Sequence, residues 1–205
     1  MALFQRTRSA APAPTAGSDP ALAALTGTYT VDPAHSSLGF TVRHAMVTNV
    51  RGFFQEFDGT LSLDGTDPAR SGAALTVNVG GIDTGNGDRD EHLRSADFFD
   101  AATYPAMTFR STAAERTDED SYRLTGDLTI KDVTRPVTID LTFNGAATDA
   151  FGNERVGFEG TAQILRSDWG LTWNANLETG GVLVSDKVRL TFDISAIRES
   201  APEAG

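Results

Sequence analysis

The chain of 205 residues is 40% hydrophobic and carries 17 Lys and Arg against 28 Asp and Glu, which gives a formal net charge of −11. This length can bury one substantial core, so a single domain is expected. The acidic balance and the lack of any run of Lys or Arg argue against a nucleic-acid partner and against electrostatic attachment to an anionic membrane.

The first 27 residues are rich in Ala, Pro, Ser, Thr and Gly, a composition typical of a flexible leader, with a short helix predicted over residues 20–25. They contain no apolar run long enough for the core of a signal peptide, and no stretch of the chain approaches transmembrane length. We therefore expect a cytoplasmic protein without stable membrane insertion. Residues 199–205 are expected to form a disordered tail.

From residue 28 onward the apolar residues recur mostly at every second position, which is the pattern of half-buried strands. Phe53 and Phe57 are assigned to one face of a long second strand, in which Gly59 is the expected kink. The predicted strands cover residues 38–44, 53–63, 73–79, 107–111, 122–130, 137–143, 156–166 and 188–194.

Short turns join many of these strands to their neighbours, which favours sequential antiparallel pairing in an up-and-down barrel or a sandwich. Several strands reach about 8–12 residues, longer than is usual in a sandwich, and a barrel removes exposed sheet edges. We predict an all-β fold, a roughly eight-stranded antiparallel lipocalin-like barrel over residues 28–198. Such a barrel has room for packed side chains or for one elongated ligand.

An insert within residues 81–100 interrupts the strand pattern with a glycine-rich turn and a charged segment. Asp88 is predicted to cap a short helix, with Glu91 three residues on completing a capping box. Arg89 and Asp90 are expected to anchor the helix, and its apolar side is formed by Leu93, Phe98 and Phe99. We predict that this helical insert caps one end of the barrel as a lid or plug.

The face predicted to point inward combines large rings with glycines. It is compatible with a tapered, packed core, and equally with a lined cavity in which the glycines leave the room. The residues concerned are Phe40, Phe53, Phe57, Phe109, Phe143, Phe158 and Phe192, with Gly59, Gly126 and Gly160.

Motifs for catalysis are weak. The sequence Asp83-Thr84-Gly85 matches the aspartic-protease tripeptide, but that chemistry needs a second such loop, which the chain lacks. There is no cysteine, and His35, His44 and His92 are scattered without metal-ligand spacing. No catalytic residue, metal or cofactor is predicted, although a metal site assembled in space from these histidines stays open.

Two polar residues stand against the apolar pattern. His44 ends the inward face of the first predicted strand, and Arg166 ends that of the seventh. A buried arginine is costly unless it is paired. These residues either close one end of the barrel as an ion pair or hydrogen-bonded rim, or receive the polar head of a ligand whose tail fills the barrel.

Several ordered motifs between residues 29 and 197 resemble the YceI-like family of bacterial polyisoprenoid-binding, lipocalin-like proteins. Asp132 departs from the family pattern, in which glycine is usual at this place. The motifs are Asp32–Phe40, Gly52-Phe53-Phe54, Ile82–Gly85, Asp97–Asp100, Gly126–Val137, Arg166–Gly170 and Val184–Val188. The resemblance implies a barrel that encloses a long isoprenoid or quinone-type chain, with no catalytic activity assigned to the family. Family members commonly carry a signal peptide, which we do not find here.

The leading hypothesis is therefore non-enzymatic binding of a polyisoprenoid or isoprenoid quinone for storage, transport or sequestration. His44, Arg89 and Arg166 are the candidates for contact with the head group. The expected ligand-binding residues are Phe40, Val42, His44, Phe53, Phe57, Arg89, Phe98, Phe99, Phe109, Phe143, Phe158, Ile164, Arg166, Trp169 and Phe192. The alternatives are a small enzyme with a histidine base, or a stress-related module with a packed core. Whether the barrel forms a homodimer stays open at this point.

Overall fold

The computed structural model describes residues 19–178 and 180–200. The predicted flexible leader up to residue 18 and the predicted tail from residue 201 lie outside the described residues. The short helix predicted before the barrel is present as α1, which spans Pro20–Ala23. The Asp19 carboxylate caps it by accepting a hydrogen bond from the amide of Ala21 at 2.9 Å.

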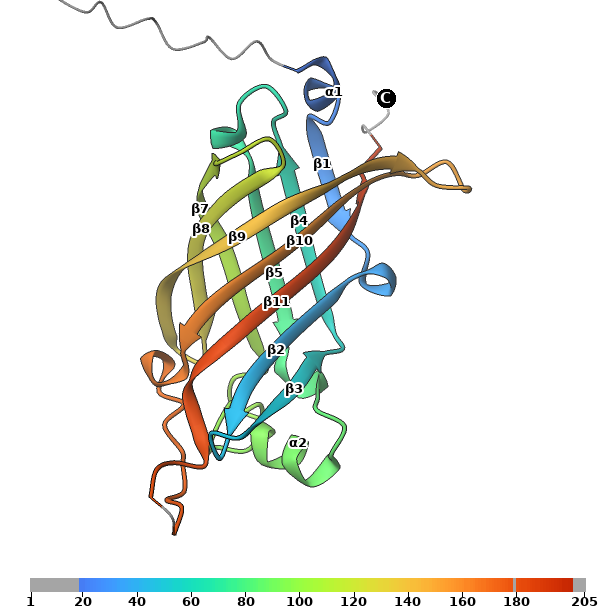
Figure 1. Ribbon diagram of the computed structural model, residues 1–205. Coiled ribbons are helices and arrows are strands. Elements are labelled where there is room, and N and C mark those ends of the chain that lie inside the picture. Colours follow the sequence, from blue (N-terminus) through green and yellow to red (C-terminus); the bar gives the residue numbers. More distant parts are fainter. Residues whose placement is uncertain (1–18, 179, 201–205) are drawn as a thin grey trace, which may run out of the picture.

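Eight antiparallel strands close into a barrel, as predicted (Figure 1). The ring runs β1-β4-β5-β7-β8-β9-β10-β11 and returns to β1 through an additional pairing of β1 with β11. Closure leaves every strand of this ring with a hydrogen-bonded neighbour on both sides. The strands are β1 Gly27–Val31, β4 Phe57–Leu63, β5 Gly72–Asn78, β7 Ala106–Arg116, β8 Ser121–Ile130, β9 Val133–Thr148, β10 Glu154–Leu165 and β11 Val184–Arg198.

Three further strands lengthen one side of the wall. They are β2 Ser37–His44, β3 Thr48–Phe54 and β6 Ile82–Asp83. The first part of β11 pairs with β2 and its last part with β1, while β3 pairs with β2 and β6 with β3. The pairs β1 and β2, β4 and β3, and β5 and β6 are therefore three long strands, each bent where a short irregular segment interrupts it.

The bend between β3 and β4 corrects the prediction for residues 53–63. The strand breaks after Phe54, where the Gln55 amide donates to the Gly81 carbonyl at 3.0 Å and the Asn78 amide to the Glu56 carbonyl at 2.9 Å. Two residues separate Phe54 from the inward-facing Phe57 instead of one, and this extra residue reverses the alternation, as a bulge does. The assignment of Phe53 to the inward face and of the kink to Gly59 was therefore wrong.

The insert folds as the helix α2, Gly87–Arg94, which lies across one end of the barrel near β3 (Figure 1). Its cap is Asn86, whose side chain accepts from the Arg89 amide at 2.9 Å, so the predicted capping box at Asp88 and Glu91 was wrong. The anchoring prediction is confirmed. Buried Asp90 accepts from the amide of Thr84 at 2.9 Å, and the Arg89 guanidinium donates to the Thr84 carbonyl at 2.8 Å.

Among the described residues, two of the three clusters of buried apolar side chains lie toward the α2 end of the barrel. The larger gathers around Phe98, Phe109, Trp169 and Leu171, and both clusters take in the partly buried Leu93 and Phe99 of the insert. The third, around Tyr29, Val156 and Ala196, is small. No helix among the described residues is long and apolar enough to span a membrane.

Candidate functional site

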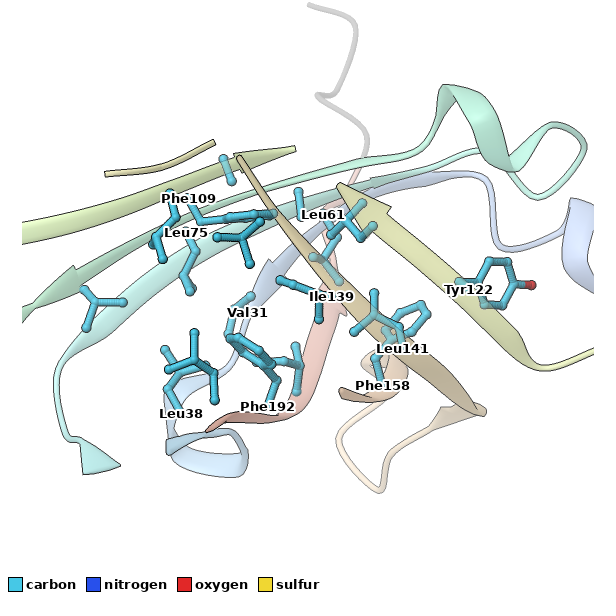
Figure 2. A pocket seen from close by; sticks show the side chains of 18 of the residues that line it. Val31, Leu38, Leu61, Leu75, Phe109, Tyr122, Ile139, Leu141, Phe158 and Phe192 are labelled. Atoms are coloured by element: carbon cyan, nitrogen blue, oxygen red, sulfur yellow. The ribbon is translucent and has the colours of Figure 1, made fainter. Parts of the chain in front are cut away.

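A cavity of about 610 Å³ runs along the inside of the barrel. This volume lies within the roughly 300–1,000 Å³ that is common for small-molecule pockets. Figure 2 shows how Leu61, Leu75 and Phe109 on one wall face Val31, Leu38 and Phe192 on the other, with Ile139 between them. These side chains come from strands far apart in sequence, and each occupies an inward position of a period-two strand.

The glycines of the inward face do not create this space. A Cβ atom built at Gly126 would lie 2.5 Å from the Phe109 ring, and one at Gly160 would lie 2.5 Å from a methyl of Leu141. The room left by each glycine is thus already filled by a neighbouring strand. Of the two interpretations of the inner face, the lined cavity is present, but its volume does not come from the missing side chains.

The α2 end of the cavity, here called the closed end, is sealed by packed rings. Phe98 is 6% exposed and Trp169 is 2% exposed. The indole Nε1 of Trp169 donates to the Leu128 carbonyl at 3.0 Å, which ties the 3-10 turn Arg166–Trp169 to β8. Trp173 contacts the Phe98 ring, with their centroids 5.4 Å apart. These packed rings close this end of the cavity with apolar surface.

Arg166 belongs to the same seal. Its side chain is buried, and its guanidinium donates to four backbone carbonyls, those of Leu171, Trp173, Val184 and Ser185. Burial lowers the pKa of Arg166, an effect that the nearby charge of Asp186 opposes. Among the described residues no carboxylate lies within ion-pair distance of this guanidinium. Of the two structural alternatives, the hydrogen-bonded rim is the one present.

The opposite end, here called the open end, lies at α1. Four of the residues that line the cavity there are themselves exposed, namely Asp19, Thr66, Arg116 and Arg123. They come from the cap of α1, the connection 64–71 between β4 and β5, and the β7–β8 hairpin. Leu22 and Leu25 add an apolar border on the α1 side. The cavity therefore meets solvent at the end away from α2.

Ten of the fifteen predicted ligand-binding residues line the cavity. They are Phe40, Val42, Phe98, Phe99, Phe109, Phe143, Phe158, Ile164, Arg166 and Phe192. Their inward position follows from the alternation of the strands, or from the packing of the segment after α2 against the barrel.

The other five do not line the cavity. Phe53 is 48% exposed on the outer face of β3, and Phe57 packs into the core cluster beside Leu38 and Phe54. Trp169 is buried behind the cavity wall and bonded to β8. Arg89 is held by Thr84, and His44 is the last residue of β2, opposite Thr48.

The largest omission from the prediction is aliphatic. The inward Leu124, Leu128, Val137 and Ile139 line the cavity and were visible in the period-two pattern of β8 and β9, but only the aromatic positions were selected. Leu22 is different, because a four-residue helix before the barrel gives no sequence signal that it borders a cavity.

None of the three histidines lines the cavity. His92 lies on α2, with Nε2 2.9 Å from the Asp97 carboxylate, and His35 lies outside the barrel wall beside Asp32, at 2.7 Å. Within residues 19–178 and 180–200, no three His, Cys, Asp or Glu side chains come together in a group able to hold a metal. The cavity thus offers shape and apolar surface, with polar groups concentrated at the open end.

Sequence comparison finds a family model described as YceI-like domain that matches residues 29–196. Protein YceI of Escherichia coli O17:K52:H18 is 34% identical over 178 residues, 86% of this chain and 90% of that protein. A UPF0312 protein of Vibrio cholerae serotype O1 is 36% identical over 151 residues, 73% of this chain and 80% of that protein. Helix α1 lies before the matched residues.

Solved structures show the same architecture. BcnA of Burkholderia cenocepacia superposes with a TM-score of 0.71 at 28% identity, over 80% of this chain and 98% of that structure. A polyisoprenoid binding domain from Saccharophagus degradans superposes with a TM-score of 0.65 at 18% identity, over 83% and 98% respectively. At that identity the second similarity shows the fold alone.

Proposed function

The chain belongs to the YceI-like family, and from this premise we propose that it binds a long-chain lipophilic molecule inside the barrel without chemical turnover. The observation that carries the proposal is the cavity of about 610 Å³, apolar along its length and closed at one end. A module stabilised only by its core would have filled this space, because interiors are normally close-packed.

The physical chemistry of the cavity favours a chain over a compact solute. Each methylene removed from water contributes about 0.8 kcal/mol, so a long apolar tail can bind tightly with few polar contacts. A cavity that extends from the closed end to the open end suits an extended shape. One solved structure with this fold is described as a polyisoprenoid binding domain, which supports an isoprenoid ligand. We propose a polyisoprenoid or an isoprenoid quinone, held for storage, transport or sequestration.

Direct identification of the ligand tests the proposal. Protein purified from its native host would be extracted with organic solvent, and the extract analysed by mass spectrometry. We expect an isoprenoid lipid in a fixed ratio to protein. Native-host material matters because expression elsewhere can load a foreign lipid.

A matched pair of variants links the ligand to the cavity. Ala73 lines the cavity from β5, whereas Thr76, on the same strand, is exposed and does not line it. Ala73→Phe should strongly reduce the extracted lipid, because the ring occupies the space of the tail, and Thr76→Phe should leave it unchanged. Equal lipid in both variants, or a lipid-free wild-type protein that binds no added isoprenoid, would contradict the proposal.

A further inference from the structure

We propose that the head of the ligand lies at the open end beside Tyr122, and that this site selects an uncharged polar head over a phosphate. The inference rests on the proposed function, because it assumes that an apolar tail occupies the cavity. It places the head at the open end. The head-group candidates from the sequence, His44, Arg89 and Arg166, lie instead at the α2 end.

The closed end has little to offer a polar head. Arg166 is the charged side chain that lines the cavity there, and its donors are directed to the four backbone carbonyls described above. Phe98 and Leu171 cover the same end and are 6% and 5% exposed. A head group carried to this depth would lose its hydration, and a polar group buried without compensating hydrogen bonds costs several kcal/mol.

The open end has both polar groups and access to water. Tyr122, at the start of β8, lines the cavity, and Figure 2 shows its hydroxyl pointing away from Leu141 and Phe158. The ring continues the apolar wall, so a tail can pack on it while the hydroxyl reaches the head. An aromatic residue with one polar atom suits such a boundary between apolar and wet surroundings.

The side chains around Tyr122 leave its hydroxyl for a ligand. The Arg116 guanidinium lies 6.0 Å from the centroid of the Tyr122 ring and donates to the carbonyls of Asp118 and Glu119, which fixes the β7–β8 turn. These hydrogen bonds of Arg116 go to backbone carbonyls and not to the Tyr122 hydroxyl. A hydroxyl both donates and accepts, so it matches an alcohol or a carbonyl.

The charged residues that line the cavity at the open end are balanced, two carboxylates and two arginines, but the segments that carry them are acidic. The cap of α1, the connection 64–71 and the hairpin segment 115–123 together carry three arginines and seven carboxylates. The arginines are Arg70, Arg116 and Arg123, and the carboxylates are Asp19, Asp64, Asp67, Glu115, Asp118, Glu119 and Asp120. Arg70 is itself paired with Asp64 at 2.6 Å. Hydrogen bonds from Thr66 and the Asp67 amide lower the pKa of Asp64, so it stays ionised at neutral pH. A phosphate here would meet net repulsion, which salt would screen.

Three probes with the same fifteen-carbon tail test the inference: farnesene without a head, farnesol with a hydroxyl and farnesyl phosphate with an anion. Affinities would be measured by displacement of a fluorescent apolar dye. For the wild type at low salt we expect farnesol to bind about three- to tenfold more tightly than farnesyl phosphate, with a smaller ratio at 0.5 M salt. Tyr122→Phe should weaken farnesol about two- to tenfold and leave farnesene unchanged.

Two controls make the result specific. Tyr104→Phe alters a tyrosine that does not line the cavity and should change no affinity. A farnesyl chain with a photoreactive diazirine at its head end reports position independently of any variant, and should label residues 64–71 or 115–123.

Several outcomes would overturn the inference. Labelling of α2 or of residues 166–184 would place the head elsewhere, and so would equal effects of Tyr122→Phe on farnesol and farnesene. Tighter binding of farnesyl phosphate than of farnesol would show that the site prefers an anionic head. If the wild type bound neither farnesene nor farnesol, the proposed function would fail as well, and that result differs from all of these.

Discussion

The two ends of the barrel carry similar residue types, but one end is closed by them and the other is open to solvent. At the closed end, aromatic rings and Arg166 are buried, and the guanidinium is consumed by backbone carbonyls. At the open end, Tyr122 and Arg116 border the same cavity but meet solvent. Arg166 is therefore held in the fold by its hydrogen bonds, while Arg116 at the open end is exposed beside the cavity. Residue type alone does not reveal a binding role, because burial and partners decide it.

The largest difference between the ends should appear in aromatic and aliphatic truncations. Phe98→Ala at the closed end should lower the free energy of unfolding by about 3–4 kcal/mol, because it opens a hole in a packed cluster. Leu22→Ala at the half-exposed border of the open end should cost less than about 1 kcal/mol and speed ligand exchange. Urea unfolding and dye-release kinetics measure the two effects. Comparable destabilisation by both variants would remove the distinction between the ends.

The arginines give the next test. Arg166→Met should destabilise the fold by about 2–3 kcal/mol, since it leaves buried carbonyl groups without a donor. Arg123→Gln is the control at the open end, where the exposed guanidinium pairs with Asp140 at 3.5 Å and Glu115 at 3.9 Å. It should change stability by no more than about 0.5 kcal/mol. If Arg166→Met kept the stability of the wild type but lost lipid binding, Arg166 would instead have a head-group role.

A smaller effect should separate two glycines on β10. A Cβ at Gly160 meets a Leu141 methyl at 2.5 Å, whereas a Cβ at Gly157 meets the Asn144 Cβ at an ordinary 3.6 Å. Gly160→Ala should therefore cost about 1–2 kcal/mol by overpacking, and Gly157→Ala close to nothing. Thermal unfolding compares them. Equal melting temperatures of the two variants would show that the Leu141 side chain moves into the cavity to accommodate the added methyl group at residue 160.

The smallest effect concerns pH and the hairpin between β9 and β10, which projects beside the open end (Figure 1). Arg155 bridges Asp32 at 2.6 Å and Asp149 at 2.7 Å. The hydrogen bond from Arg155 lowers the pKa of the Asp32 carboxyl, and hydrogen bonds from Asn153 and Arg155 lower that of Asp149. Their contribution to stability is present above the unfolded carboxyl pKa of about 4 and is lost as the pH falls through the folded values.

Urea unfolding at several pH values measures this contribution. The free energy of unfolding should fall below about pH 4, and Arg155→Gln should flatten the decline. Arg123→Gln, whose exposed ion pairs lie away from the hairpin base, serves again as the control. An unchanged pH profile in Arg155→Gln would show that this network does not set acid stability.

Most of the fold could be predicted because the strands and the insert each produce a local pattern of apolar and polar residues. Alternation along β8 and β9 sets which residues face inward, and the insert stands out because it breaks that alternation. The register change at Gln55 was missed because a bulge adds one residue without altering composition. The cap of α2 was misplaced because Asn86 and Asp88 are both good caps, and the turn at Gly85 decides between them.

The sequence by itself determined an all-β barrel with a helical insert and an apolar lining, since strand geometry forces period two on any half-buried strand. Only the tertiary structure decided which end of the cavity is closed. That choice depends on contacts between distant segments, such as Trp169 with Leu128 and Arg166 with Ser185. Such contacts leave no periodic trace in the sequence, because they depend on how the turn Arg166–Trp169 after β10 folds over the end of the barrel.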